Sequence, residues 1–542
     1  MDKKTRYIFV TGGVISGLGK GISAASIGNI LKARGFSIFV LKLDPYLNID
    51  PGVMSPYEHG EVYVTKDGGE TDLDLGHYER FIDVELTKDS NWTSGRIYKR
   101  LFEKERNGDY KGKTVQVIPH LTDEITKIIH ETAEKYQPDF MIIEVGGTIG
   151  DIESDPFIEA ISKMKFNHYE DVFLAMVTYI PYLSSSNEFK SKPTQVSLLN
   201  LRSRNLSPNL VLLRNEKLVP HDIMLKIASK TNLHLEEIIA IPDLENIYFA
   251  PQYFERTRVA DVILKYFKIE PIKADFSEWE HLIDLIKAKK THQIHLVMIG
   301  KYVEFHDAYK SIIEALKIAS YHTDVELKLT WKDSSRINDD NKRLLKTFYD
   351  GVVILPGFGR RGFEGKVTTA LYTREIKMPT LGICLGMQAM SVAQARLKGY
   401  KNATSAEFAT RGADEVFVLN ILEGKDKEKN LGGTLRLGNY DVKLLEGSLA
   451  HKAYEKDLIT ERHRHRYEIT EEFKEILQDD EFVFSGINPE TNLAEIAEVK
   501  NHPFYLGTQY HPEFTNRPLK GHSLFMEFLK AIIREKEKEE NN

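Results

Sequence analysis

Short apolar runs alternate with amphipathic stretches along the first half of the chain. Four runs predict buried strands: "SIFVLKLD" (37–44), "FMIIEVGG" (140–147), "DVFLAMVTYI" (171–180) and "NLVLLRN" (209–215). The stretches between them have helical character. Strands that alternate with helices are typical of a parallel sheet with both faces covered.

A second series of the same kind begins after a break. Between 267 and 292 the chain is charged and amphipathic and lacks a core strand. The new series comprises "IHLVMIGKY" (294–302), "VELKLTW" (325–331), "GVVILPG" (351–357) and "TLGICLGM" (380–387). We therefore predict an α/β protein without internal repeats, divided into a first domain (1–266), a linker (267–292), a second domain (293–535) and a polar tail (536–542).

Composition narrows the class of protein. With 542 residues, 42% hydrophobic and 28% charged, the chain resembles a soluble globular protein of roughly two to four domains. Its net charge of −7 gives no indication of binding to nucleic acid or to an anionic membrane. We find neither a signal-peptide core nor a long uncharged apolar span, so we expect a cytoplasmic protein.

A glycine-rich stretch near the N-terminus, "TGGVISGLGKG" (11–21), follows a predicted strand and precedes a predicted helix. It does not fit the usual phosphate-loop pattern, because Val14 stands where the first glycine belongs and Gly21 where Ser or Thr belongs. Its glycines could nevertheless turn backbone N–H groups toward one anion, with Lys20 at the helix start. From these residues alone, a phosphate site and a plain strand-to-helix turn both remain open.

Cys384 is the single cysteine, which excludes an intramolecular disulfide and a cluster of thiolates around a metal. In "GICLGMQ" (382–388) it lies at a strand-to-helix junction, where a helix N-terminus lowers the pKa of a thiol. "QYHPEF" (509–514) offers His511 as a base and Glu513 as the group that orients it. The alternative is a buried structural cysteine and an unrelated histidine.

Carboxylates in the first half could hold magnesium. "GGETDLDLGHYERF" (68–81) supplies Glu70, Asp72 and Asp74, although a solvated acidic loop would have the same composition. Glu144 closes the apolar run at 140–147, where a charge is costly unless a cation is paired with it. Glu144 is therefore the more informative residue.

The second domain resembles the class I glutamine amidotransferase family, since "PGFG" (356–359), "GICLGMQ" and "HPEF" occur in the same order. The resemblance implies that Cys384 attacks the amide of glutamine, releasing ammonia and leaving a glutamyl thioester. His511 would be general base and acid, Glu513 its orienting partner, and the backbone near Gly357 and Leu385 the oxyanion hole. Relatives carry P-G-G-F-G, so this chain is one glycine short.

The basic stretch "RHRHRYE" (462–468) does not favour a metal, because Arg462, Arg464 and Arg466 surround its two histidines and would repel a cation. A basic run is usually a solvated surface or an anion site. By the same resemblance, Arg466 binds the α-carboxylate of glutamine. The implied glutamine pocket comprises Gly357, Leu385, Gly386, Met387, Gln388, Glu407 and Arg466.

Across almost its whole length the chain resembles the CTP synthase family. The similarity rests on "TGGVISGLGKG", "KLDPYLNIDPG" (42–52), "SPYEHGEV" (55–62), "GDIES" (150–154) and "KSKPTQ" (190–195), in order and spacing. It implies a phosphate-loop-type synthetase domain of parallel-sheet architecture before the amidotransferase domain. The implied reaction phosphorylates O4 of UTP with ATP and displaces the phosphate with ammonia that reaches it through an internal channel, giving CTP.

The resemblance also assigns residues in the first domain. Lys42 assists phosphoryl transfer, and Asp74 and Glu144 bind Mg²⁺. Relatives usually have S-S-L-G-K-G in the phosphate loop, where Gly17 replaces the second serine here. The ATP site comprises Gly17, Leu18, Gly19, Lys20, Gly21, Ile22 and Asp74; the UTP/CTP site comprises Ser16, Asp151, Ile152, Glu153, Lys190, Ser191, Lys192, Pro193, Thr194, Gln195 and Lys226.

Regulation and assembly are further implications of the resemblance. GTP is expected to activate glutamine hydrolysis through the loop "GGTLRLG" (432–438) and Arg361, and CTP to inhibit as product. We expect a homotetramer. Two other interpretations compete: an ATP-dependent amidoligase acting on a carboxylate, which gives "GDIES" and "KSKPTQ" no role, and a non-catalytic filament protein, against which the intact Lys20, Cys384 and His511 argue.

Overall fold

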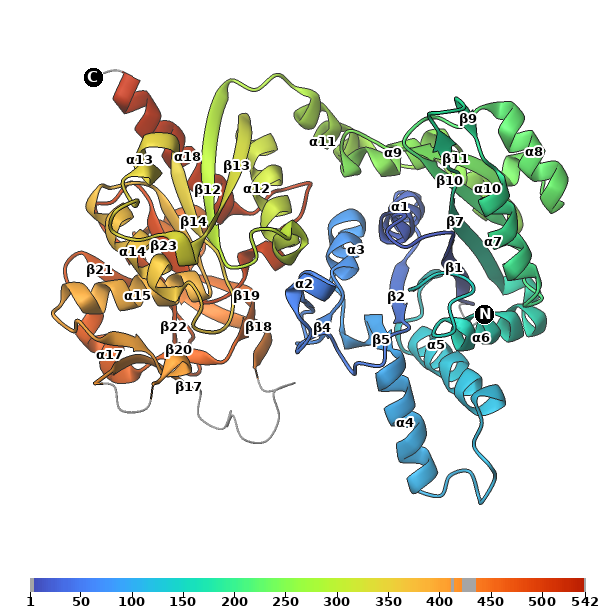
Figure 1. Cartoon of the computed structure of the whole chain (residues 1–542), viewed down its shortest axis with the longest axis horizontal. Helices are drawn as coiled ribbons and strands as arrows, with labels where there is room; N and C mark the ends of the chain where they lie inside the picture. The colour runs from blue at the N-terminus through green and yellow to red at the C-terminus, as the bar shows by residue number, and fades with distance from the viewer. Residues whose placement is uncertain (1–3, 411–413, 422–434, 541–542) are drawn as a thin grey trace. The chain divides into compact units, whose positions relative to one another are not determined.

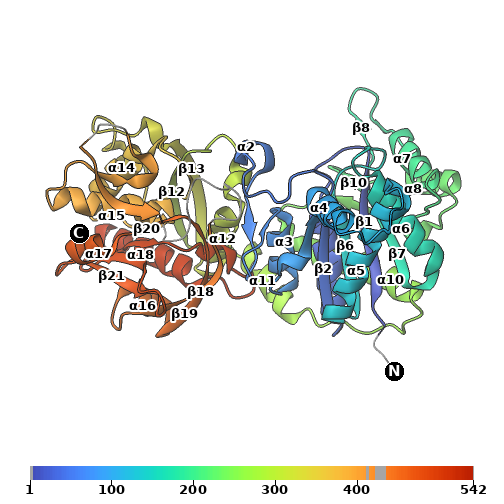
Figure 2. The same ribbon diagram turned by 90° about the horizontal axis from the view of Figure 1, so that it is seen from below.

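The computed structural model describes residues 4–410, 414–421 and 435–540. The chain forms two compact units (Figures 1 and 2). Unit 1 comprises Met1–Pro51 and Asp74–Ile283, and unit 2 comprises Gly52–Leu73 and Asp284–Asn542. The chain thus passes from unit 1 into unit 2 and back again before residue 74.

Unit 1 is built on a parallel sheet whose strands are long apolar runs. Within its described residues, seven strands lie in the order β11-β10-β7-β1-β6-β2-β5, and every neighbouring pair is parallel. Their bounds are β1 (Arg6–Gly13), β2 (Ile38–Asp44), β5 (Asn91–Thr93), β6 (Phe140–Val145), β7 (Val172–Tyr179), β10 (Leu210–Asn215) and β11 (Ile238–Pro242). A small hairpin pairs β8 (Tyr182–Leu183) with β9 (Glu188–Phe189).

Helices cover both faces of this sheet, as its largely apolar central strands require. One face carries α4 (Ser94–Arg106), α5 (Thr122–Tyr136), α6 (Asp155–Asn167), α7 (Lys192–Arg202) and α8 (His221–Thr231), whose apolar residues share a core with Phe9 and Leu41. The remaining helices of the unit are α1 (Lys20–Lys32), α3 (Asp74–Ile82), α9 (Ala250–Arg256) and α10 (Val259–Tyr266), and α1 contacts the other three.

Unit 2 contains a larger sheet of mixed direction. In its described part nine strands lie in the order β13-β12-β14-β15-β23-β22-β21-β18-β19, of which β13 to β23 are parallel and the rest antiparallel. The bounds are β12 (His292–Gly300), β13 (Val325–Asp333), β14 (Gly351–Ile354), β15 (Thr380–Ile383), β18 (Arg436–Leu444), β19 (Leu458–His465), β21 (Phe482–Ile487), β22 (Ala494–Val499) and β23 (Tyr505–Thr508).

The parallel part of this sheet separates two hydrophobic cores. α12 (Lys310–His322) and α18 (Ser523–Glu540) contribute to one core, and α14 (Phe363–Glu375) and α15 (Leu385–Leu397) to the other. The unit also contains α13 (Leu344–Phe348), α16 (Leu449–Tyr454) and α17 (Glu471–Leu477), and a small sheet of β16 (Ala403–Ser405), β17 (Val416–Ile421) and β20 (Tyr467–Ile469).

Residues 52–73, which we call the inserted segment, fold onto unit 2. The segment contains α2 (Pro56–His59) and the hairpin of β3 (Tyr63–Val64) with β4 (Glu70–Thr71). Buried hydrogen bonds hold it: the hydroxyl of Tyr63 donates to the Phe514 carbonyl at 3.0 Å, and Arg462 donates to the Val64 carbonyl at 3.1 Å. Glu61 accepts from the Ser311 N–H at 3.1 Å.

The predicted α/β class is confirmed, and the eight apolar runs all contain strands. Residues 267–292, expected as a linker, include the helix α11 (Ser277–Lys287), whose Trp279, Leu282 and Ile283 are buried. The indole of Trp279 donates to the Tyr248 carbonyl of unit 1 at 2.9 Å. The predicted domain boundaries stay a prediction, and residues 52–73 of the predicted first domain belong to unit 2.

Candidate active sites

Cys384 occupies a sharp turn between β15 and α15 in unit 2. Its backbone adopts φ 52° and ψ −104°, a conformation that non-glycine residues rarely take and that persists where the surroundings enforce it. Its N–H donates to the Thr508 carbonyl of β23 at 2.6 Å, which anchors the turn to the sheet. The side chain is 4% exposed, so the turn presents the sulfur to an enclosed space at the helix N-terminus.

His511 and Glu513 form the pair predicted from the sequence. Nδ1 of His511 lies 2.7 Å from Oε1 of Glu513, and both side chains are buried. Burial opposes the charged imidazole, but the carboxylate of Glu513 and the nearby sulfur of Cys384 outweigh it and raise the pKa of His511 to about 10. At neutral pH the ring is therefore an imidazolium, which stabilises a neighbouring thiolate.

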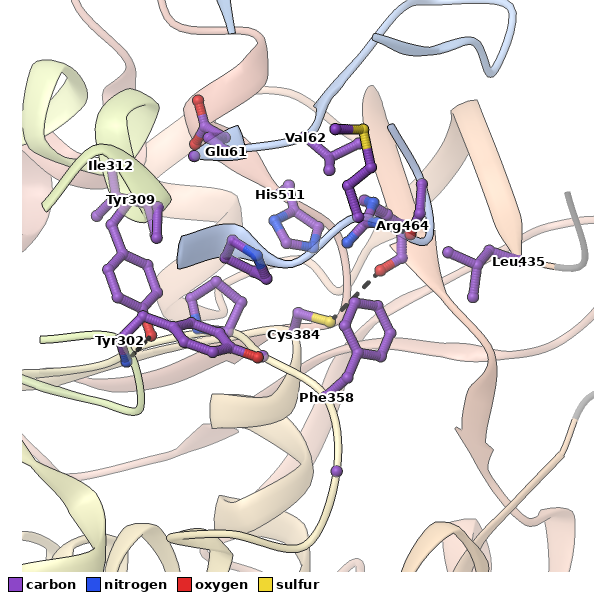
Figure 3. A pocket seen from close by; sticks show the side chains of 18 of the residues that line it. Glu61, Val62, Tyr302, Tyr309, Ile312, Phe358, Cys384, Leu435, Arg464 and His511 are labelled. Carbon is purple, nitrogen blue, oxygen red and sulfur yellow. Dashed lines mark hydrogen bonds between the residues drawn. The ribbon is translucent and has the colours of Figure 1, made fainter. Parts of the chain in front are cut away.

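These three residues line a cavity of about 520 Å³ within unit 2 (Figure 3). Figure 3 shows the sulfur of Cys384 and the ring of His511 inside the cavity, with Phe358 beside the sulfur. The sulfur lies 3.8 Å from the Arg464 carbonyl. The inserted segment supplies part of the wall, including Glu61 and Val62. The cavity is large enough for an amino acid beside the thiol.

Several predicted glutamine-binding residues meet in this cavity. Gly357, Glu407 and Arg466 line it, and Glu407 accepts a hydrogen bond from the N–H of Gly359 at 2.6 Å. The other four belong to the first turn of α15 and lie behind Cys384: Leu385, Gly386, Met387 and Gln388. Gln388 donates to the Tyr467 carbonyl at 3.1 Å, next to Arg466.

Two further groups at this site were not predicted from the sequence. Gln509 donates to the Cys384 sulfur at 3.7 Å and accepts from Gln388 at 3.2 Å. Lys301, which is 2% exposed, donates to the Phe358 carbonyl at 2.7 Å. Burial, with Arg361 adding to it, lowers the pKa of Lys301 to about 8 despite the opposing effect of Glu407. The only sequence feature that could have indicated Gln509 as part of the site is its position two residues before "HPEF".

In unit 1, the glycine-rich stretch connects β1 to α1. Val14, Gly17 and Gly19 have positive φ angles of 81°, 74° and 81°, so the backbone turns repeatedly before the helix begins at Lys20. The side chain of Lys20 passes over Gly12, where a Cβ atom would lie 2.7 Å from Cδ of the lysine. Its ammonium donates to the Gly147 carbonyl at 2.7 Å. A lysine at the start of a helix after such a loop suits a phosphate.

Gly21 explains one departure from the usual phosphate-loop pattern. A Cβ atom at Gly21 would collide with the carboxylate of Asp74. Asp74, the first residue of α3, therefore occupies the space into which a Ser or Thr side chain at position 21 would extend. An acidic oxygen thus lies at the start of α1, where the common pattern has a hydroxyl.

Lys42 connects the two predicted metal ligands. β2 and β6 are parallel neighbours whose register places Lys42 opposite Glu144. The ammonium of Lys42 pairs with Glu144 at 2.8 Å and also with Asp74. Burial raises the pKa of Glu144, although Lys42 opposes the shift; for Asp74 burial is outweighed by Lys42 and His77, which hold the pKa at about 2.

Two neighbours of this group were not predicted. Tyr78 is fully buried and donates its hydroxyl to the second oxygen of Glu144. Burial and the adjacent carboxylate of Glu144 raise its pKa well above the usual value, so it keeps its proton. Asp44, which ends β2, accepts from Asn91 at 2.7 Å. Burial raises the pKa of Asp44 to about 6, against the effect of Lys42.

The donor set fits magnesium bound together with phosphates. Asp74 and Glu144 converge on the ammonium of Lys42, so their oxygens can approach one cation. Within the described residues, no cluster of three or more His, Cys, Asp or Glu side chains could hold a metal. Mg²⁺ commonly takes one or two carboxylates, completing its shell with substrate phosphates and water.

The other two carboxylates of the predicted acidic cluster lie in unit 2. Glu70 pairs with Arg464 at 2.9 Å, and Asp72 with His59 at 3.3 Å. Only Asp74 of the three belongs to unit 1. The acidic stretch 68–81 is therefore divided between the units rather than forming one metal site.

Most of the predicted UTP/CTP residues lie in loops and helix starts that follow strands of the sheet, and Lys226 lies in the middle of α8. Ser16 follows β1, Asp151–Glu153 follow β6, residues 190–195 follow β7, and Lys226 in α8 follows β10. Because these strands are parallel, their carboxyl ends share the edge where open α/β sheets bind ligands. Gly150, next to Asp151, lies near Asn200 of α7, the helix that begins within the 190–195 stretch.

Part of the predicted GTP-responsive loop, Gly432 to Thr434, lies outside the described residues. The described Arg361 donates to the Lys301 carbonyl and lies 3.4 Å from Asp333. None of the described helices combines the length and the apolar character needed to cross a bilayer.

Comparisons with known proteins show which family the chain belongs to. Residues 6–269 match the family model described as "CTP synthase N-terminus", and residues 304–531 match "Glutamine amidotransferase class-I". A CTP synthase of Mycoplasmopsis pulmonis is 63% identical over 98% of this chain and 99% of that protein. A CTP synthase of Caldanaerobacter subterraneus subsp. tengcongensis is 46% identical, over 97% and 98% respectively. A solved Trypanosoma brucei CTPS glutaminase domain with bound acivicin is 27% identical and covers 44% of this chain and 94% of its own, with a TM-score of 0.41.

Proposed function

Because the chain belongs to the CTP synthase family, we propose that Cys384 and the Lys20–Lys42–Asp74–Glu144 group carry the two halves of its reaction. The chain is a glutamine-hydrolysing ligase that aminates UTP to CTP, the final step of pyrimidine nucleotide synthesis, using ATP-dependent chemistry. Its substrates are nucleotides and glutamine. We further propose a role for each site residue, a magnesium ion, and GTP and CTP as effectors.

In the glutaminase half, the Cys384 thiolate attacks the side-chain amide carbon of glutamine. His511, positively charged beside it, gives a proton to the departing nitrogen, which leaves as ammonia. The glutamyl thioester is then hydrolysed by water from which His511 takes a proton. Glu513 keeps the imidazole oriented and charged. The N–H groups of Gly357 and Leu385 stabilise the tetrahedral oxyanion.

Glutamine itself is held by the rest of the cavity. Arg466 pairs with the α-carboxylate and Glu407 with the α-ammonium, while the first turn of α15 (Leu385, Gly386, Met387 and Gln388) supports the pocket from behind. An arginine and a glutamate in one cavity provide complementary charges for a zwitterionic amino acid.

In the synthetase half, O4 of UTP attacks the γ-phosphorus of ATP, and ADP leaves. Ammonia then adds to C4 and expels the O4 phosphate, which gives CTP. Lys20 and the backbone of Gly17, Leu18, Gly19, Gly21 and Ile22 bind the ATP phosphates, and Lys42 moves from its carboxylates to the transferring group. Asp74 and Glu144 would hold Mg²⁺, which would supply neutralisation of the phosphate charge.

The UTP triphosphate and the product CTP share the loops at the carboxyl edge of the sheet. The basic residues in the proposed set are Lys190, Lys192 and Lys226; the others are Ser16, Asp151, Ile152, Glu153, Ser191, Pro193, Thr194 and Gln195. GTP as activator, CTP as inhibitor, a homotetramer and a cytoplasmic location complete the proposal, with neither nucleic acid nor a membrane as partner.

One observation carries the assignment of residues: Cys384, His511 and Glu513 line one cavity in a chain that also holds a lysine and two carboxylates beside a phosphate-type loop. The test is the absorbance change when UTP becomes CTP, measured with ATP and magnesium and with glutamine or ammonium as nitrogen source. We expect strict dependence on ATP, UTP and magnesium. Amidation of a carboxylic acid with UTP left untouched would overturn the proposal.

A further inference from the structure

A buried lysine on α14 is directed at the loop that carries Gly357. Lys366 is fully buried, and its ammonium donates to the Leu355 carbonyl and, at 3.4 Å, to the Pro356 carbonyl. Burial, together with the nearby ammonium of Lys301, lowers the pKa of Lys366 well below its usual value. An amine and an ammonium both donate, so the contacts with the carbonyls do not depend on the charge.

Lys301 holds the next part of the same loop from another element. It follows β12 and donates to the carbonyls of Phe358 and Gly359. Two buried lysines therefore donate hydrogen bonds to four of the five carbonyls of residues 355–359. Lys366 binds those of Leu355 and Pro356, and Lys301 binds those of Phe358 and Gly359. Burying two lysines is costly, so this arrangement is expected where backbone geometry matters.

The contact at Pro356 fixes the N–H of Gly357. In a planar trans peptide, the carbonyl of one residue and the N–H of the next point in opposite directions. When Lys366 holds the Pro356 carbonyl, the Gly357 N–H must point away from the ammonium of Lys366. Gly357 itself has φ 151°, so without a constraint this glycine could turn easily.

The surroundings of the loop in unit 2 show what lies on the side away from Lys366. Phe363 and Val367, on either side of Lys366 in α14, belong to the core that also contains α15. Figure 1 shows these two helices side by side. Cys384 belongs to the other core, together with Leu355 and Ile383. Gly357 and Cys384 are among the described residues that line the cavity and Lys366 is not, so an N–H that points away from Lys366 is directed toward the cavity.

We propose that Lys366 is a positioning residue for glutamine hydrolysis: it sets the Pro356–Gly357 peptide so that its N–H serves the oxyanion formed at Cys384. Lys366 touches neither substrate nor sulfur and acts through the peptide. This inference rests on the proposed role of Cys384 and Gly357.

The test compares Lys366→Met with Lys474→Met in the full-length enzyme. Methionine keeps the length and apolar character of the stem and removes the donor. Lys474 is the matched control, since it is also buried in unit 2 and donates to a main-chain carbonyl, that of Asn492 at 2.8 Å. We expect Lys366→Met to lower kcat for glutamine hydrolysis roughly 10- to 100-fold with KM changed less than about threefold, because the donor is misdirected rather than deleted.

Two further measurements separate positioning from general damage. γ-Glutamyl aldehyde forms a tetrahedral adduct with the thiol, and its affinity should fall in Lys366→Met by the same factor as kcat/KM. Alkylation of Cys384 by iodoacetamide needs no oxyanion hole and should proceed at the parental rate, as should CTP synthesis from ammonium. Lys474→Met should match the parent in every assay.

If Lys366→Met binds the aldehyde as tightly as the parent enzyme does, this inference is overturned. It is also overturned if aldehyde affinity and the rate of Cys384 alkylation fall by the same factor, because that result would indicate a collapsed cavity. Neither outcome touches the assignment of the nucleophile. That assignment fails separately, if Cys384→Ala still hydrolyses glutamine.

Discussion

The cavity of unit 2 and the lysine–carboxylate group of unit 1 prepare their chemistry in different ways. In unit 2 the proposed catalytic groups are held in place by their surroundings: the turn fixes Cys384, and His511 is held 2.7 Å from Glu513. In unit 1 the charges satisfy one another, with Lys42 shared by Asp74 and Glu144. A neutral amide can enter a fixed site, whereas a site for phosphates and a cation must keep its charges paired until the substrates arrive.

The comparison predicts that a single amide substitution disables the charge-paired site completely. Asp74→Asn or Glu144→Gln should lower CTP synthesis on the order of 10³-fold or more with either glutamine or ammonium, because both the cation site and the partner of Lys42 are lost. Initial rates with the two nitrogen sources are the measurement. Near-normal synthesis from ammonium would mean that these carboxylates do not hold the metal.

The substitution Cys384→Ala should affect only the glutaminase half of the reaction. Without a nucleophile, glutamine-dependent synthesis should fall on the order of 10³-fold or more, while synthesis from ammonium at alkaline pH stays within about twofold of the parent. Both nitrogen sources should be measured on one preparation. If Cys384 were a packing residue, the variant would be less stable but would still use glutamine.

Gly21→Ser tests how tightly the phosphate-type loop and Asp74 are fitted. Although serine matches the common pattern, its Cβ would collide with the Asp74 carboxylate, so we expect a loss of roughly 10- to 100-fold in ammonium-dependent synthesis. Gly17→Ser is the matched control: its Cβ meets nothing within 4 Å, and the positive φ costs about 1 kcal/mol. Equal activity of the two variants would contradict the predicted fit.

Glu513→Gln should change stability in a pH-dependent manner. His511 has a folded pKa of about 10 against an ordinary 6.5, so its charged form contributes stability that is present below pH 6.5 and is lost as pH rises through 10. Removing the carboxylate lowers the folded pKa. The variant should melt about 2 to 4 °C below the parent at pH 7, with a smaller difference at pH 10.5. Thermal unfolding at the two pH values measures this, and a constant difference would contradict the pairing.

The local sequence pattern was sufficient to predict the helices and strands, and the candidate site residues whose partners lie in the same short segment. The apolar runs marked the strands, the glycines around Cys384 marked the turn, and His511 and Glu513 are two positions apart in one segment. Lys20 likewise follows from its place after the glycine-rich loop. Such information is contained in short stretches because strand and turn preferences are largely local.

Other features of the sites could not be predicted locally, because they depend on which segments, distant along the chain, come into contact in the fold. Sheet register pairs Lys42 with Glu144, 102 positions later, and helix packing places Asp74 against Gly21. The acidic stretch looked like one cluster, yet Glu70 and Asp72 pair with unit 2 while Asp74 serves unit 1. Spacing along the chain could not reveal that division, because nothing local marks where the chain leaves one unit for the other.

The sequence by itself therefore determined the fold class and singled out Cys384, His511 and the glycine-rich loop, whose roles stay predictions. Tertiary structure alone decided the partners: Tyr78 for Glu144, Gln509 for Cys384, and Lys366 for the carbonyls before Gly357. The physical reason is that a buried polar group must find its hydrogen-bond partner wherever the packed chain places one. That position is set by register and helix packing, which bring residues far apart in sequence within 3 to 4 Å.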